Sequence, residues 1–65
     1  MKAIPTDIYD KDGNITAIEF NDLEGNFLVE AKWDEREEQT SENRIAFRKW
    51  AYKFIKDNLG YEVNK

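Results

Sequence analysis

The fold is decided by residues 8–33, which read IYDKDGNITAIEFNDLEGNFLVEAKW. Two glycine-centred turn signals, Asp12-Gly13-Asn14 and Glu24-Gly25-Asn26, separate stretches in which apolar and polar residues alternate. Alternation with a period of two is typical of strands, and short turn signals between such stretches are typical of hairpins. This part of the chain therefore predicts a three-stranded antiparallel meander, with strands at about residues 4–10, 14–21 and 26–33.

The first loop is predicted from the face on which the large apolar side chains gather. A three-residue loop, residues 11–13, pairs Ile8 with Thr16 and puts the large side chains on one face of the sheet. A two-residue loop would pair Ile8 with Ala17 and divide them between both faces. Because a slip of one residue moves every side chain to the opposite face, we expect the three-residue loop.

The second loop is predicted in the same way. A four-residue loop, residues 22–25, pairs Phe20 with Phe27 and keeps the next strand on the same face. Pro5 has no N–H to donate, which suits the first strand as an edge strand. The predicted core face of the sheet carries seven apolar residues, Ile4, Ile8, Ile18, Phe20, Val29, Ala31 and Trp33.

The second half of the chain predicts one amphipathic helix at about residues 41–59. Thr40 or Ser41 is the expected N-cap, and Gly60 is the expected left-handed stop. The predicted core stripe of the helix consists of Phe47, Trp50 and Phe54, with Ala51 and Ile55 on its flank and Ala46 on its margin. Because this stripe is expected to be buried, Trp50→Ala is predicted to cost about 3–5 kcal/mol.

These elements predict a single α+β domain over residues 1–65, in which the meander packs on one C-terminal helix. No second layer remains to cover the other face of the sheet. That face is expected to expose an apolar patch of Tyr9, Ile15 and Leu28, next to Asp7, Glu19, Glu30 and Lys32. The sequence analysis identifies no internal repeat.

Composition narrows the function classes. The chain contains neither cysteine nor histidine, which removes disulfides, thiol nucleophiles and the usual zinc ligands. Ser41 is the one serine, and no histidine is present to activate it. We therefore expect no enzymatic activity, no cofactor and no bound metal. Without an apolar run of membrane-spanning length or a signal-type start, a cytoplasmic protein is expected.

The charge is unevenly distributed along the chain. Residues 1–42 hold twelve acidic and four basic residues, a net charge of −8, whereas residues 43–65 hold six basic and two acidic residues, a net charge of +4. The acidic part argues against non-specific binding of nucleic acid by the whole molecule. A local basic strip is expected on the outer helix face, where Ile45, Lys49, Tyr52 and Lys56 recur at helical spacing beside Arg48 and Lys53.

Two acidic segments invite a metal interpretation. Residues 10–14, DKDGN, resemble the opening of a calcium-binding loop, but Ile15 stands where glycine is required and Asn21 stands where the bidentate acid is required. A hairpin turn is the favoured interpretation. The acidic run 34–42 is interpreted as a solvated connector, with contact to a basic partner and a metal site as alternatives.

The order of three antiparallel strands and one helix resembles the architecture of the arm-binding domains of phage integrases and of plant AP2-type DNA-binding domains. The resemblance implies this α+β fold. Those domains bind DNA through the sheet face, where this chain is expected to carry Asp7, Glu19 and Glu30. The charge of that face therefore disfavours the same function here.

Two function classes remain. The first is a non-catalytic protein-binding module of inhibitor, adaptor or accessory type, whose partner is another protein or a second copy in a homodimer. The second is a nucleic-acid-binding domain that uses the basic helix strip. The candidate contact residues come from the open sheet face and the outer helix face, and they are Tyr9, Ile15, Leu28, Arg48, Lys49, Tyr52 and Lys56.

Overall fold

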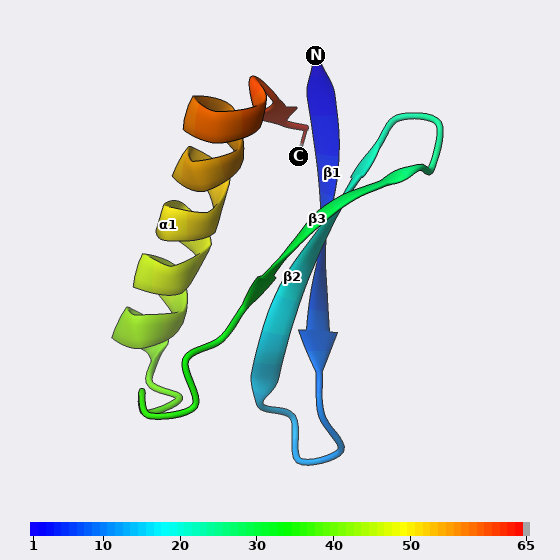
Figure 1. Ribbon diagram of the computed structural model, residues 1–65. Coiled ribbons are helices and arrows are strands. Elements are labelled where there is room, and N and C mark those ends of the chain that lie inside the picture. The colour runs from blue at the N-terminus through cyan, green and yellow to red at the C-terminus, as the bar shows by residue number, and fades with distance from the viewer. Residues whose placement is uncertain (65) are drawn as a thin grey trace.

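One helix lies along one face of a twisted four-stranded sheet in the computed structural model, which describes residues 1–64 (Figure 1). The sheet order is β3-β2-β1-β4, and β1, β2 and β3 form the antiparallel meander. This arrangement confirms the predicted α+β fold. The elements are β1 (Lys2–Tyr9), β2 (Ile15–Asp22), β3 (Phe27–Lys32), α1 (Ser41–Leu59) and β4 (Glu62–Val63).

The first hairpin has the predicted three-residue loop. The Asp10 backbone N–H donates to the Asn14 carbonyl at 2.9 Å, and Gly13 closes the loop with a φ of 82°. The Asp10 carboxylate accepts the backbone N–H groups of Asp12 and Asn14 at 2.9 and 3.0 Å. These bonds use the carboxylate to hold a hairpin turn.

The second hairpin repeats the turn of the first. The Asp22 backbone N–H donates to the Asn26 carbonyl at 2.9 Å, so the loop has three residues and the predicted four-residue loop is wrong. Gly25 has a φ of 88°, and the Asp22 carboxylate accepts the N–H groups of Glu24 and Asn26. The pattern D-x-x-G-N thus recurs at 10–14 and 22–26, an internal repeat that the sequence analysis missed.

A β-bulge follows the first turn. Tyr9 pairs with Ile15, but Ile8 pairs with Ala17, which leaves Thr16 as the extra residue. The predicted pairing of Ile8 with Thr16 is therefore wrong, although the loop length was right. A bulge adds one residue to one strand, so it changes the register beyond it without changing the turn.

The second hairpin has a bulge at the equivalent place. Asn21 pairs with Phe27, while Phe20 pairs with Val29, so Leu28 is the extra residue. The predicted pairing of Phe20 with Phe27 is accordingly wrong. The D-x-x-G-N turn and the bulge two residues after it recur together in both hairpins.

The two bulges rearrange the predicted core. Ile15 moves to the helix side of the sheet with Ile18 and Phe20, while Ile4 and Ile8 fall on the uncovered face. The predicted core positions of Ile18, Phe20 and Ala31 are confirmed, and Val29 and Trp33 pack against this core while partly exposed. The buried core consists of Ala3, Ile15, Ile18, Phe20, Ala31, Ala51 and Ile55.

The helix has the predicted bounds but a different buried face. Thr40 is the N-cap, accepting the Asn43 N–H at 3.1 Å, and Gly60 ends the helix with a φ of 73°. Ala51 and Ile55 are its buried residues, whereas Trp50 is 55% exposed. Phe47 packs against the core as predicted, but the fully buried residues are those of the predicted flank, and the buried face is rotated by about 100° around the helix axis from the predicted one.

Small residues at the contact between the helix and the sheet account for this rotation. Three alanines in the buried core, Ala3, Ala31 and Ala51, let the two layers approach closely. A tryptophan at the Ala51 position would separate them. Trp50 and Phe54 therefore lie at the side of the contact, and Phe54 remains 36% exposed.

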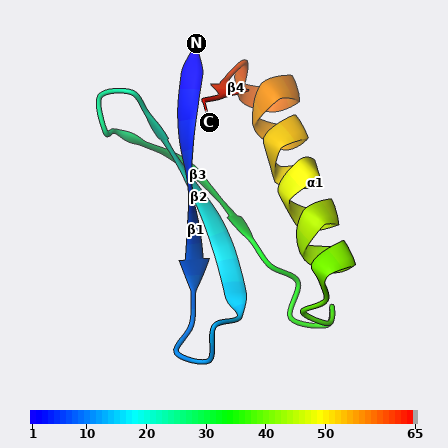
Figure 2. The ribbon, with the colours of Figure 1, turned by 180° about the vertical axis from the view of Figure 1, so that it is seen from behind.

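The chain ends on a short strand that the sequence analysis did not predict. β4 runs parallel to β1, where the Glu62 N–H donates to the Met1 carbonyl at 2.9 Å and the Asn64 N–H donates to the Ala3 carbonyl at 2.7 Å (Figure 2). β1 is therefore an interior strand at its start. Pro5 lies beyond the β4 pairing, on the part of β1 that remains an edge.

Candidate protein-binding surface

The patch predicted on the open sheet face does not form. Ile15 is 1% exposed and belongs to the core, and Leu28 is half-buried against that core. Tyr9 is exposed, but it shares the helix side of β1 with Asp7, to which its hydroxyl donates at 3.3 Å. The bulges are the cause, because they turn Ile15 and Leu28 toward the helix.

Arg48 and Tyr52 hold the helix on the sheet. Arg48 Nη2 lies 2.8 Å from Asp7 Oδ2 on β1, and this carboxylate raises the pKa of the guanidinium. The Tyr52 ring meets Phe20 edge-on, with ring centroids 5.9 Å apart, and burial raises the pKa of its hydroxyl. Both predicted contact residues thus make contacts inside the chain.

The basic strip on the helix is narrower than predicted. Lys49 and Lys56 are exposed, as expected for contact residues. Lys53 forms an ion pair with Asp57 at 2.8 Å, one helical turn further along. With Arg48 paired to β1, two of the four expected cations are neutralised within the chain.

Four aromatic side chains form a continuous surface feature, here called the aromatic ladder: Trp33, Phe47, Trp50 and Phe54. Trp33 meets Phe47 edge-on at 5.1 Å, Phe47 stacks with Trp50 at 6.3 Å, and Trp50 stacks with Phe54 at 5.7 Å between ring centroids. Helical spacing aligns the last three, and Trp33 follows the end of β3. The residues predicted as the core stripe of the helix therefore form a partly exposed surface.

Trp33 is fixed by backbone contacts at both ends of the residue. Its backbone N–H donates to the Thr16 carbonyl at 2.9 Å, and its indole Nε1–H donates to the Glu37 carbonyl at 3.2 Å. The first bond extends the β3 pairing by one residue, and the second anchors the connector to the ring. The first ring of the ladder is thus held in a single orientation.

The connector between β3 and α1 is tied down at several points. The Gln39 side chain donates to the Ile15 carbonyl at 2.9 Å and accepts the Ile15 N–H at 3.1 Å, as a paired strand residue would. Asp34 binds Arg36, which lowers the pKa of that carboxyl. The predicted connector thus has a defined path, and its acidic side chains remain exposed.

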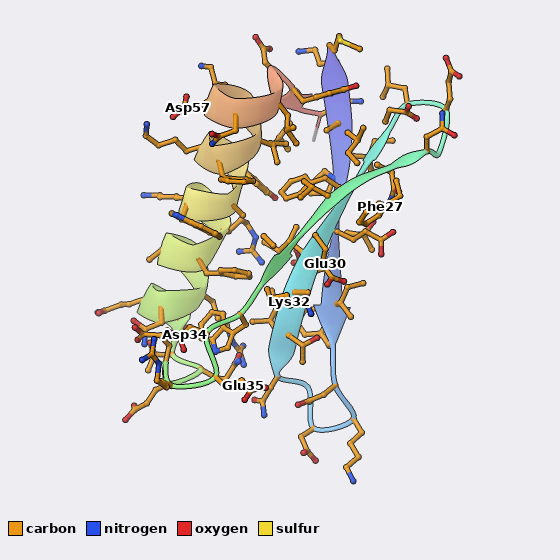
Figure 3. The ribbon with its side chains drawn as sticks, in the orientation of Figure 1. Phe27, Glu30, Lys32, Asp34, Glu35 and Asp57 are labelled. Carbon is orange, nitrogen blue, oxygen red and sulfur yellow. The ribbon has the colours of Figure 1, made fainter. Side chains whose placement is uncertain are left out.

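A hollow of about 450 Å³ lies between the connector and the first turns of α1. It is lined by three ladder residues, by Ala46 and by four polar or charged residues, Lys32, Asp34, Glu37 and Asn43. In Figure 3, Lys32, Asp34 and Glu35 follow one another from β3 toward the N-terminal end of the helix. The acidic connector therefore borders the aromatic ladder.

The uncovered sheet face is the second apolar surface. Phe27 is 60% exposed, and Ile4 is 41% exposed on the neighbouring part of the sheet. The register places Glu19 opposite Glu30 and Ala17 opposite Lys32 on this face. Charged residues therefore interrupt its apolar residues, whereas the four ladder rings touch in sequence.

Sequence reasoning predicted all four ladder residues as core, which is right for Trp33 and Phe47 and wrong for the exposed Trp50 and Phe54. Phe47, Trp50 and Phe54 recur at helical spacing, and so do Phe47, Ala51 and Ile55. Hydrophobicity favours the larger residues for burial. No signal in the sequence itself shows that the alanines occupy the contact, because that depends on the distance between the two layers.

Comparison of the chain with protein-family models, with curated proteins and with solved structures finds no match. Among residues 1–64, no group of three metal-ligating side chains converges. No helix within this range is long and apolar enough to cross a membrane.

Proposed function

We propose that this chain is a non-catalytic protein-binding module of inhibitor, adaptor or accessory type, and that the aromatic ladder is its contact surface. The observation that carries the proposal is the exposure of Trp50, which is 55% exposed while it stacks between Phe47 and Phe54. Tryptophan is enriched at the centres of protein interfaces, where its large surface is buried on binding.

The surroundings of the ladder support the same function. Asp34 and Glu37 lie on its connector side, and Lys49 and Lys53 are exposed on the neighbouring turns of the helix. An apolar centre with a polar rim is the usual anatomy of a protein interface. Trp50 and Phe54 form the exposed half of the ladder, and exposed rings contribute less to folding than buried ones, so their clustering favours a role in binding.

Nucleic acid is the less favoured partner. Arg48 is paired with Asp7 and Lys53 with Asp57, so the helix offers fewer free cations to phosphate than its sequence suggests. The acidic connector beside the ladder would repel a phosphate backbone.

The absence of cysteine suits a reducing compartment, and we propose a cytoplasmic location on that basis.

The experiment compares three immobilised forms of the full chain: wild type, Trp50→Gln and Phe27→Gln. Each is exposed to lysate of the cells that produce the protein, and the captured proteins are identified by mass spectrometry. Phe27 is the matched control, because it is an equally exposed aromatic residue on the uncovered sheet face. We expect Trp50→Gln to lose the partner and Phe27→Gln to retain it.

Three results would contradict the proposal. One is equal capture by wild type and Trp50→Gln, and another is loss of the partner with Phe27→Gln alone. The third is sub-micromolar binding of duplex DNA or RNA with a steep salt dependence in a filter-binding assay, which would assign the chain to the nucleic-acid class. Sedimentation of the same proteins shows whether the partner is a second copy of the chain.

A further inference from the structure

We propose that the hollow beside the ladder binds a cationic side chain, an arginine or a lysine, of the protein partner. This inference rests on the proposed function and specifies the chemistry of the partner. The hollow measures about 450 Å³, which lies within the range of roughly 300–1,000 Å³ typical of binding pockets. Three aromatic rings and two carboxylates share its lining.

The ring orientations suit a cation. Trp33 stands at 80° to Phe47, whereas Phe47 and Trp50 lie within 20° of parallel. The hollow therefore has aromatic walls in two nearly perpendicular directions. The face of an aromatic ring carries negative charge density and attracts ammonium and guanidinium groups, most strongly for tryptophan.

The carboxylates add the same electrostatic preference. Glu37 lines the hollow while its backbone carbonyl holds the Trp33 indole, so the connector positions ring and charge together. Asp34, on the same rim, is engaged by Arg36 at 3.0 Å. Lys32 also lines the hollow and opposes a cation, but residues 34–42 contain five acids and one base. The local field therefore favours a positive ligand.

The larger hollow, of about 570 Å³ on the other side of Trp33, lacks this combination. It shares Lys32, Trp33 and Glu37 with the first, and it adds three acidic residues, Asp10, Glu30 and Glu35, among aliphatic and polar residues of the first hairpin and the connector. It contains one aromatic ring. The larger hollow therefore offers carboxylates alone beside one ring, whereas the smaller hollow is the site at which a cation can contact several aromatic rings together with a carboxylate.

The first test uses ¹⁵N-labelled protein, in which the two indole N–H signals report on Trp33 and Trp50. The probes are the blocked tripeptides acetyl-Gly-Arg-Gly-amide and acetyl-Gly-Lys-Gly-amide. Their controls replace arginine by citrulline and lysine by norleucine, which have similar shape and no charge. Probes are added to about 20 mM, since an affinity in the millimolar range is expected for one side chain.

We expect both cationic probes to shift the two indole signals and to bind about three- to tenfold more tightly than their neutral controls. Raising the salt concentration should lower the affinity of the cationic probes and leave the affinity of the neutral probes unchanged. Equal affinity of charged and neutral probes would overturn the inference, and so would shifts that occur only outside the hollow.

Variants separate the two parts of the site. Glu37→Gln should reduce the affinity for the arginine probe about two- to fivefold, and Trp50→Leu should remove the preference for arginine over citrulline. Phe27→Leu is the matched control and should bind the probe as wild type does. If the partner is lost with Trp50→Gln but the probes show no charge preference, the binding module stands and the cationic site is rejected.

Discussion

At the scale of single residues, side-chain size decided burial more than hydrophobicity did. Phe20 is fully buried in β2, while Trp50 on the helix is more than half exposed. Ala51, next to Trp50, is fully buried because a small residue lets the helix approach the sheet. The most hydrophobic face of the helix by residue type is therefore not its core face.

Phe20 and Trp50 should accordingly differ in what their removal costs. Phe20→Ala is expected to lower the free energy of unfolding by about 3–5 kcal/mol, because it leaves a cavity in the core. Trp50→Ala loses two stacked contacts at the surface, each worth roughly 0.5–1.5 kcal/mol, and should cost about 1–2 kcal/mol. Urea unfolding followed by circular dichroism measures both.

If Phe20→Ala unfolds the chain, Phe20→Leu is the variant to measure. Its smaller change of side-chain volume lowers the free energy of unfolding less. A larger loss for Trp50→Ala than for Phe20→Ala would contradict the observed helix face.

At the scale of elements, one local design is used twice. Each hairpin turn begins with an aspartate whose carboxylate accepts two backbone N–H groups, and each has a left-handed glycine and then asparagine. In each hairpin a β-bulge lies two residues after the asparagine of the turn, at Thr16 and at Leu28. Bulges increase the local twist of a strand pair, and the sheet in Figure 1 is strongly twisted.

The second turn should make stability depend on pH. Hydrogen bonds from Asn26 lower the pKa of Asp22 below its ordinary value of 3.8. The unfolded chain therefore takes up this proton first, and the turn loses stability as the pH falls through the acidic range and is unaffected near neutrality.

Melting temperatures measured between neutral and strongly acidic pH test this expectation. Asp22→Asn retains an acceptor oxygen without a titrating charge, so the decrease should be smaller in this variant. The matched control is Asp12→Asn, because Asp12 is exposed at the tip of the first loop. An identical decrease in wild type and Asp22→Asn would show that other carboxylates account for it.

At the scale of the whole molecule, the two ends of the described chain meet. β4 pairs with the first residues of β1 (Figure 2), and Lys2 Nζ lies 2.9 Å from Glu62 Oε2. Val63 packs against the core, and the Tyr61 N–H donates to the Ile55 carbonyl at the end of the helix. This short strand therefore fastens the C-terminal end of the helix to the sheet.

A disruptive substitution in β4 should free the C-terminal end of the helix from the sheet. Val63→Asp places a charge in a half-buried apolar position and is expected to cost about 1–3 kcal/mol. Asn64→Asp adds the same charge at an exposed neighbour and is the matched control. Chemical denaturation gives the two free energies, and hydrogen exchange should show faster exchange in the last helical turn of Val63→Asp. Equal stability of the two variants would show that β4 contributes nothing.

The candidate site was only partly predictable. Trp50 and Phe54 of the ladder were expected in the core and are exposed, while Ile15 and Leu28 were expected at the surface and lie against the core. Both errors come from features that a residue pattern does not contain. A bulge changes the face of the sheet on which the side chains after a turn lie. The separation of the helix from the sheet decides which side of the helix is buried.

The sequence by itself determined the meander, the first loop, the helix bounds and both helix caps. These features depend on residues adjacent in the chain: glycine allows the left-handed turns, Thr40 caps the first N–H groups, and Gly60 ends the helix. The register beyond each turn, the rotation of the helix and the pairing of β4 with β1 were decided by the tertiary structure. They depend on how closely the layers pack, a quantity that exists only once distant parts of the chain are in contact.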